Sequence, residues 1–265
     1  MNQVGIFRKT YKNKKLKNKQ DNLLEGDKYP LKESKIEFNG LLDLRQKNLF
    51  EVDQLKKLRT RLLFPAKGRI PRSVAVTSAG IGEGKTFVSA NLAVSIAQNI
   101  DNRQTFLLDC DLSRPSIHSL FGFEDLPGLA EYLAGNAPLA EYLLKPLAIN
   151  QLTILPGGTP PYNPSELLSS KKMSDLLEEA LSRYDDRYIV IDLPSPLLVP
   201  ETGLIINHVD GVIIVLHYGK TLKSSLKELI NIIGKDNVLG VVFNHFDTSM
   251  HSFFYRMYRK YVRRK

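Results

Sequence analysis

Residues 73–87 read SVAVTSAGIGEGKTF, an apolar run followed by a glycine-rich turn and the start of an amphipathic segment. This order predicts a strand, a loop and a helix. The spacing Ala79-x-x-x-x-Gly84-Lys85-Thr86 is the Walker A pattern with Ala in place of the first Gly. Glycines let the backbone N–H groups face a polyphosphate, and the N-terminus of the following helix adds positive potential. The segment therefore predicts a nucleotide site; the alternative is a glycine-rich turn that binds nothing.

Each part of this loop has an expected role. Lys85 is expected to reach the β- and γ-phosphates, and the Thr86 hydroxyl to ligate Mg²⁺. ATP and Mg²⁺ are therefore the expected cofactors. The residues expected to contact the nucleotide here are Gly80, Ile81, Gly82, Glu83, Gly84, Lys85, Thr86 and Phe87.

Five further apolar runs follow the one at residues 73–78. They span residues 105–109, 152–155, 188–192, 211–218 and 239–244. These runs are continuously apolar, as strands covered on both faces should be. Helical patterns occupy residues 85–98, 164–182 and 222–233, and a leading helix is expected from Leu49 to near Pro65. The chain is thus predicted to be an α/β protein with a doubly wound, mostly parallel sheet, helices on both faces and its site at the carboxyl ends of the strands.

Acidic residues end two of the predicted strands. Asp109 and Asp111 are two positions apart, so their side chains share a face if the strand continues through both. Asp192 follows four apolar residues, as the Walker B position requires. Carboxylates beside a phosphate loop can organise Mg²⁺ and accept a proton from an attacking hydroxyl. The alternative for the first pair is a solvated or helix-capping role.

The formal charge of +9 is concentrated at the two ends of the chain. Residues 1–20 carry seven Lys or Arg and residues 251–265 carry six, with no acid in either segment, so the middle is slightly acidic. Such segments can lie on anionic lipid, contact nucleic acid, or be solvated and disordered. No segment resembles a known nucleic-acid reader, so nucleic acid is not an expected partner. The single cysteine, Cys110, excludes an internal disulfide and a multi-cysteine metal site.

The expected organisation has three parts. Residues 1–45 are a basic, mostly disordered arm, residues 46–250 are the P-loop domain with its leading helix, and residues 251–265 are a basic, tyrosine-containing tail. No run approaches the eighteen or so apolar residues of a membrane span, and the N-terminus lacks the apolar core of a signal peptide. A cytoplasmic protein, at most peripheral at a membrane surface, is expected.

The segments SAGIGEGKT, DCDLSRP and IDLPSP resemble the Walker A, A′ and B motifs of the bacterial tyrosine kinases of capsule and exopolysaccharide synthesis, within the MinD/ParA-like P-loop ATPases. Further similar segments are GLAEYLAG, NPSELLSSKKM, VDGVIIVLHYGKT and LGVVFN. The resemblance covers about residues 53–247. It implies an ATP- and Mg²⁺-dependent tyrosine autokinase in which Lys85, Asp109 and Asp111 are catalytic. It also implies that Thr86, Asp109 and Asp192 hold the metal and that Asn244 contacts adenine.

Two departures disfavour sibling families. Gly80 stands where MinD and ParA proteins carry a lysine, and one cysteine cannot supply the cysteine pair of Mrp-type scaffold proteins. Ser113 is a departure from the kinases themselves, which usually carry an Arg at this position. The family's oligomerisation motif, Glu-x-x-Arg-x-x-Arg, is replaced by Asp53-x-x-Lys56-x-x-Arg59. A homo-oligomer is expected, and the alternative for these residues is an exposed helix face with i, i+3 pairs.

The last residues, SFFYRMYRKYVRRK, leave three interpretations open. By resemblance, Tyr255, Tyr258 and Tyr261 are phosphoacceptors for a neighbouring subunit, with Asp109 or Asp111 as the base. A helix here would also place its aromatic residues on one side and its cations on the other, as in an interfacial membrane helix. The third interpretation is a terminal helix packed on the domain.

The resemblance therefore predicts an autokinase that regulates capsular or exopolysaccharide chain length or export. It implies activation by a membrane-bound polysaccharide co-polymerase, a separate polypeptide, at the inner face of the bacterial cell membrane. The alternative is a MinD-like regulatory ATPase switch that controls membrane or partner binding without phosphorylating tyrosine. A DNA-partitioning ATPase is a third hypothesis, disfavoured by Gly80.

Overall fold

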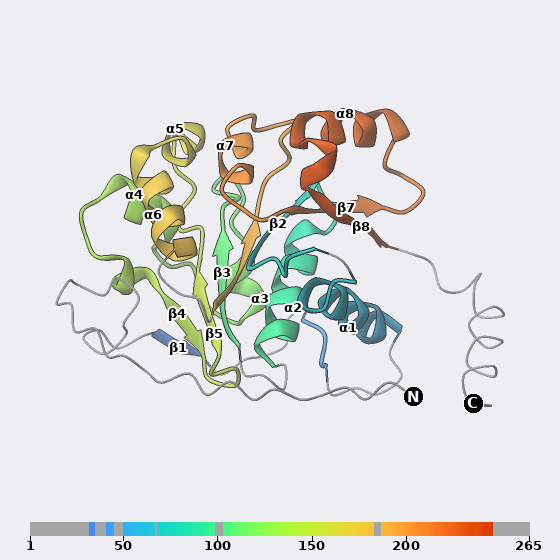
Figure 1. The fold of residues 1–265 in the computed structure, drawn as a ribbon. Helices are drawn as coiled ribbons and strands as arrows, with labels where there is room; N and C mark the ends of the chain where they lie inside the picture. The colour runs from blue at the N-terminus through green and yellow to red at the C-terminus, as the bar shows by residue number, and fades with distance from the viewer. Residues whose placement is uncertain are drawn as a thin grey trace.

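The computed structural model describes residues 32–34, 41–44, 50–66, 68–98, 103–182 and 187–245. Within them, eight strands form one sheet in the order β1-β4-β5-β3-β6-β2-β7-β8 (Figure 1). Neighbouring strands are parallel except β4 and β5. The strands are β1 (Lys32–Ser34), β2 (Ser73–Ser78), β3 (Gln104–Asp109), β4 (Leu144–Pro146), β5 (Leu152–Leu155), β6 (Arg187–Asp192), β7 (Val212–His217) and β8 (Val238–Asn244).

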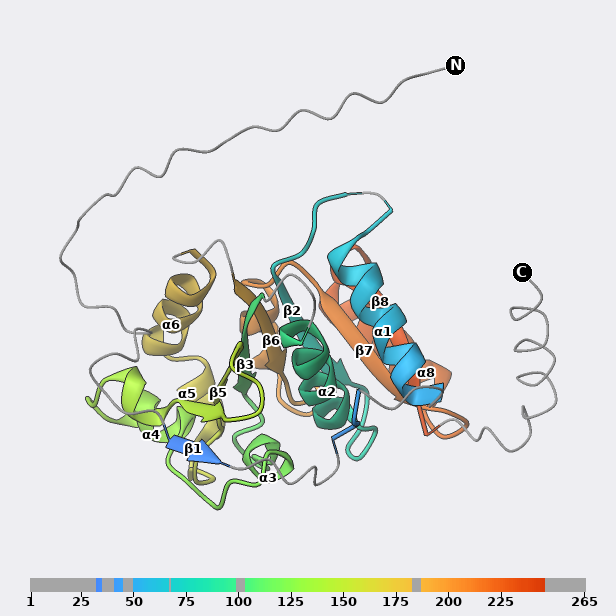
Figure 2. The same ribbon diagram turned by 90° about the horizontal axis from the view of Figure 1, so that it is seen from below.

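Helices cover both faces of this sheet and bury two apolar cores. The helices α1 (Phe50–Leu63), α2 (Lys85–Ala97) and α3 (Ile117–Leu120) pack on one face, where α1 and α2 lie side by side (Figure 2). The opposite face carries α4 (Leu129–Ala134), α5 (Pro164–Leu168), α6 (Lys171–Ser182), α7 (Thr202–Ile206) and α8 (Lys223–Ile233). Short 3₁₀ helices span Leu139–Tyr142 and Lys235–Asn237. The doubly wound, mostly parallel fold is confirmed.

The continuous apolar runs of the sequence form the strands of the sheet, and the central strands are covered on both faces. Every residue of β2 is buried, and β6 and β7 each have five buried residues out of six. All six expected runs are strands whose ends lie within one residue of expectation. Because β2 lies between β6 and β7, and β3 lies beside β6, the carboxyl ends of β2, β3 and β6 meet near the middle of the sheet.

The helix expected over residues 164–182 is two helices, so that prediction was wrong. The chain breaks between α5 and α6 at Ser169 and Ser170. The Ser170 hydroxyl accepts a hydrogen bond from the backbone N–H of Met173, 3.2 Å away. A serine whose hydroxyl accepts from the backbone N–H three positions later is a helix N-cap, so Ser170 starts a new helix. The periodicity continues through the break because both helices face the same core.

Part of the segment expected to be a disordered arm belongs to the folded domain. Residues 32–34 form β1, which pairs in parallel with β4. Leu41 is buried, and the backbone N–H of Leu42 donates to the side-chain oxygen of Asn91 in α2 at 2.7 Å. Neither β1 nor β4 was expected, because three residues are too few to show a period.

Asp210 secures the amino end of β2. Its carboxylate accepts hydrogen bonds from the backbone N–H groups of Arg72 (2.8 Å) and Ser73 (3.1 Å) and from the Ser73 hydroxyl (3.0 Å). It also pairs with Arg69. Burial would raise the pKa of Asp210, but these hydrogen bonds and the charge of Arg69 outweigh burial and lower the pKa.

Replacing Asp210 by Asn should therefore destabilise the fold by about 1–2 kcal/mol near pH 7. A lowered carboxyl pKa stabilises the fold above the ordinary aspartate pKa, and this contribution disappears as the pH falls through the folded-state pKa. Urea denaturation at a series of pH values should show the difference closing below about pH 3. Asp175→Asn, at an exposed pair with Lys171, is the control and should change stability by under about 0.5 kcal/mol. A difference that persists in acid would contradict the role given to the charge.

Candidate nucleotide site

The glycine-rich loop joins the carboxyl end of β2 to the start of α2. Gly82 and Gly84 have φ angles of 75° and 92°, in the left-handed region that glycine adopts at little cost. Gly84 is the N-cap of α2 and supplies no side-chain hydrogen bond to the helix. The N–H groups in the first turn of α2 therefore remain available to an anion.

Asn244, the last residue of β8, lies against this loop. Its side-chain amide donates to the carbonyl oxygen of Glu83 at 3.0 Å. A Cβ atom on Gly84 would lie only 1.9 Å from the Asn244 amide nitrogen. Gly84 is therefore required for two reasons, its left-handed φ and this close approach. The expected adenine contact and the phosphate loop are thus adjacent in the fold.

Lys85 lies among the carboxylates that the sequence singled out. Its Nζ is 2.6 Å from Asp111 Oδ2 and 3.9 Å from Asp192 Oδ2. The same Nζ lies 3.3 Å from the Thr86 hydroxyl. Asp109 is paired with Asp192 in the register of β3 and β6, so it belongs to the same cluster. The structure thus brings together all five residues expected to perform chemistry at the loop.

The pKa values of this cluster reflect burial opposed by charge. Burial alone would lower the pKa of Lys85, but the charges of Asp192 and Asp111 outweigh it and raise the pKa. Burial raises the pKa of Asp192 well above the ordinary range, and the charge of Lys85 only partly opposes this. The pKa of Asp109 is also raised by burial, which outweighs the hydrogen bonds it accepts. Lys85 therefore stays a cation in the folded protein, whereas ionisation of Asp109 or Asp192 reduces the stability of the fold.

Asp109 and Asp111 do not share a strand face, so that expectation was wrong. The strand β3 ends at Asp109, whose Oδ1 accepts from the backbone N–H of Asp111 at 3.2 Å. This side-chain hydrogen bond turns the chain out of the sheet. Oδ2 of Asp109 accepts from the backbone N–H groups of Ser116 and Ile117, both at 3.0 Å. Asp109 thus organises the segment after β3, and Asp111 is the carboxylate directed at Lys85.

The oxygen atoms of Asp192 fit a hard divalent cation such as Mg²⁺. Both are fully buried and have no hydrogen-bond partner among the described residues. Lys85 Nζ, 3.9 Å from Oδ2, is too far to donate a hydrogen bond to it, and a buried carboxylate without hydrogen bonds is costly unless a ligand satisfies it. No group of three or more His, Cys, Asp or Glu side chains in the described ranges forms a candidate metal site. Mg²⁺ bound with nucleotide needs fewer protein ligands, because phosphates and waters supply the rest.

Two supporting residues were missed by the sequence reasoning. The Ser195 hydroxyl, after β6, donates to the Ala79 carbonyl oxygen at 3.1 Å. The Thr221 hydroxyl, after β7, donates to the side chain of Glu83 at 2.5 Å. Ser195 lies in the IDLPSP segment, so its closeness to the Walker B position was a usable signal. Thr221 ends the segment VDGVIIVLHYGKT, but its pairing with Glu83 could not be predicted, because the two residues are 138 positions apart.

The described part of α1 gives Arg59 an internal partner. Its guanidinium donates to the Ser95 carbonyl oxygen in α2 at 3.0 Å, and it lies 3.4 Å from the Ser95 hydroxyl. Asp53 is exposed. The altered oligomerisation motif thus places one of its residues in contact with the subunit's own core, and its role between subunits stays a prediction.

The proposed tail lies outside the described residues. Tyr255, Tyr258 and Tyr261 fall in this segment, as does the expected amphipathic helix. Among the helices that the structure describes, none is long and apolar enough to cross a bilayer.

Known proteins share both the sequence pattern and the fold. Residues 74–264 match the family described as the CobQ/CobB/MinD/ParA nucleotide binding domain. The tyrosine-protein kinase YwqD of Bacillus subtilis (strain 168) is 35% identical over 202 residues, which are 76% of this chain and 83% of that protein. The tyrosine-protein kinase wzc of Salmonella typhi is 36% identical over 173 residues, 65% of this chain. The chain spans only 23% of that longer relative.

A solved structure agrees with these sequence matches. The crystal structure of the chimerical protein CapA2B2 superposes with a TM-score of 0.70 and 26% identity, covering 82% of this chain and 94% of that one. The similarity therefore extends over nearly the whole described domain.

Proposed function

Because the chain belongs to the CobQ/CobB/MinD/ParA nucleotide-binding family and, within it, to the bacterial tyrosine-protein kinases, we propose that it is an ATP- and Mg²⁺-dependent protein-tyrosine autokinase. Its role is to regulate the chain length or export of a capsular or extracellular polysaccharide. The observation that carries this proposal is the placement of Lys85 between Asp111 and Asp192 at the mouth of a phosphate loop. This arrangement supplies a cation, a base and a metal ligand within one small site.

The residues divide the work of phosphoryl transfer as follows. The N–H groups of the loop and of α2 bind the phosphates, and Lys85 stabilises the charge on the transferred group. Thr86 and Asp192 would hold Mg²⁺, which would supply neutralisation of the phosphate charge when bound. Asp111, the more accessible carboxylate, accepts the phenolic proton as the tyrosine oxygen bonds to the γ-phosphorus and ADP departs. Asp109 is a positioning residue, since both its oxygens accept backbone N–H groups.

The acceptors that we propose are Tyr255, Tyr258 and Tyr261, presented to the site of a neighbouring subunit. The arginines and lysine between them would favour a phosphotyrosine product. The base end of ATP is proposed to lie against Asn244. The activator is proposed to be a membrane-bound polysaccharide co-polymerase, which would bring the kinase to the inner face of the membrane. The basic terminal segments suit an anionic lipid surface.

Mass spectrometry of the tail tests this function directly. Purified protein incubated with ATP and Mg²⁺, with the cytoplasmic segment of a co-polymerase added, should acquire phosphate on one or more of the three tail tyrosines. The matched variant with all three changed to Phe should keep ATP binding and lose the signal. Robust ATP hydrolysis with an unmodified tail would refute the kinase. If lipid binding were then lost on deleting residues after Ser252, the regulatory switch would be selected instead.

A further inference from the structure

Three segments that are distant in sequence are hydrogen-bonded to one another beside the phosphate loop. They are the loop itself (residues 79–84), the turn between β7 and α8 (residues 217–221, here the β7–α8 turn) and the end of β8 at Asn244. Phosphate loops bind the polyphosphate largely through their own backbone, so that function alone does not require the other two segments.

The side chain of Glu83 joins the first two segments. It is 7% exposed, and its two oxygens have different partners. Oε2 accepts from the backbone N–H of Ala79 at 2.9 Å, which closes the loop across its base. Oε1 accepts from the hydroxyl of Thr221. Hydrogen bonds to a charged, buried acceptor are among the stronger ones in proteins.

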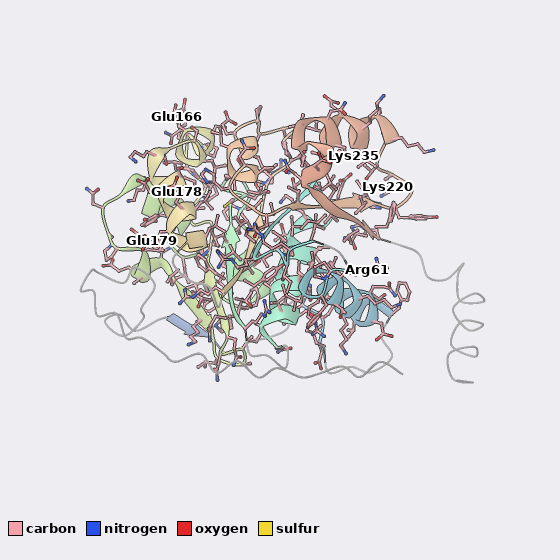
Figure 3. The ribbon with its side chains drawn as sticks, viewed as in Figure 1. Arg61, Glu166, Glu178, Glu179, Lys220 and Lys235 are labelled. Carbon is pink, nitrogen blue, oxygen red and sulfur yellow. The ribbon has the colours of Figure 1, made fainter. Side chains whose placement is uncertain are left out.

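The hydroxyl of Thr221 links Glu83 to the first residue of the β7–α8 turn. Its oxygen atom accepts from the backbone N–H of His217 at 2.9 Å while the hydroxyl proton is donated to Glu83. The backbone N–H of Tyr218 donates to the Asn244 carbonyl oxygen at 2.9 Å. Lys220, in the same turn, lies exposed at the surface (Figure 3). Both ends of the β7–α8 turn are thus held, one on the loop and one on β8.

The third segment completes a wall next to Asn244. The imidazole rings of His217 and His245 are stacked, with centroids 4.2 Å apart and planes 18° from parallel. His245 has a φ of 55°, which a residue with a Cβ seldom adopts without a constraint. The side chain of Asn244 is held by the Glu83 carbonyl oxygen. A flat nucleobase could lie against such rings and an amide.

We propose that the Glu83–Thr221 hydrogen bond positions the base-binding wall relative to the phosphate loop, so that Glu83 and Thr221 are positioning residues for the nucleoside end of the nucleotide. The inference rests on the proposed base site at Asn244. Loss of the bond would release the Thr221 end of the β7–α8 turn from the loop, leaving the turn held on β8 through Tyr218 and the wall joined to the loop through Asn244. The phosphates would still bind, because the Ala79 N–H contact and the α2 N-terminus remain.

Calorimetric titration with two probes tests this proposal. Thr221→Val keeps the shape of the side chain and removes its hydroxyl. This variant should bind Mg²⁺–ADP about 10-fold more weakly, while its affinity for Mg²⁺ with inorganic pyrophosphate should change less than about 2-fold. Thr221→Ser restores the hydroxyl and should return the ADP affinity to within about 2-fold of the starting protein. Ser224→Ala removes an exposed hydroxyl of α8 and should leave both affinities unchanged.

Each contrary result has a distinct meaning. Equal weakening for both probes would overturn the proposal, because the bond would then only support the phosphate loop. No weakening for either would overturn it as well. If the starting protein bound ADP no more tightly than pyrophosphate, the base site itself would be wrong. If Thr221→Val did not fold, Thr221→Ala, which also removes the hydroxyl and keeps Glu83 on the Ala79 N–H, should show the same selective loss. The readout is binding, so it is independent of tyrosine phosphorylation.

Discussion

Tyrosine phosphorylation should fall by about 100- to 1,000-fold when Lys85 is replaced by Met. The change removes the cation that lies 2.6 Å from Asp111 and at the start of α2, where the transferred phosphate gathers charge. Methionine preserves most of the side-chain length and packing. Initial rates of phosphotyrosine formation at saturating ATP would measure the effect.

The matched control for this variant is Lys227→Met, on the exposed side of α8. It makes the same chemical change outside the site and should retain full activity. Because Lys85 also neutralises carboxylates, its loss should weaken the fold as well, so thermal unfolding must be followed in parallel. A Lys85→Met protein that is folded and retains more than about a tenth of the rate would contradict the role of Lys85 in catalysis.

Asp192→Asn should have two opposite effects, abolishing phosphoryl transfer and stabilising the metal-free protein. The activity loss should exceed about 100-fold, since a neutral amide is a poor Mg²⁺ ligand. The stability gain follows from the two buried oxygens of Asp192, which accept no hydrogen bond among the described residues and whose charge is only partly offset by Lys85, 3.9 Å away. Because Lys85 keeps its closer partner Asp111, removing the poorly compensated charge of Asp192 should raise the free energy of unfolding by about 1–3 kcal/mol at pH 8.

The stability effect of Asp192→Asn should depend on pH in a defined direction. The folded-state pKa of Asp192 is raised, mainly by burial, to about 7. Below its unfolded-state pKa the carboxyl group is protonated in both states, so its ionisation does not affect the stability of the fold. Between the unfolded-state and the folded-state pKa the destabilisation grows, and above the folded-state pKa it is complete. The advantage of the variant should therefore be small near pH 4 and complete above about pH 8. Chemical denaturation in a chelating buffer would measure this, and a constant difference across that range would refute the assignment.

The central part of the fold could be predicted from the sequence because burial on both faces imposes continuous apolar runs. That signal was present for β2, β6 and β7 and absent for β1 and β4, which are three residues long. The helix break at Ser170 depends on a side-chain cap, which competes with a periodicity that continues on both sides of it. Local pattern thus located the elements, and specific hydrogen bonds decided their ends.

The candidate site divides in the same way. The glycine spacing and the strand-end acids located Lys85, Thr86 and Asp192. The different duties of Asp109 and Asp111 could not be predicted, because they depend on the N–H groups of residues 116 and 117 returning to Asp109. The bond from Glu83 to Thr221 joins residues that tertiary folding alone brings together.

The short strand β1 covers the edge of β4. It pairs with β4 through three residues at the edge of the sheet opposite β8. Edge pairings this short are among the first to open in native-state fluctuations, and amide exchange there should be fast. Opening of β1 would leave β4 as the exposed edge of the sheet. The buried Leu41 and the hydrogen bond from Leu42 to Asn91 would still hold the chain on α2, so the phosphate loop would not change.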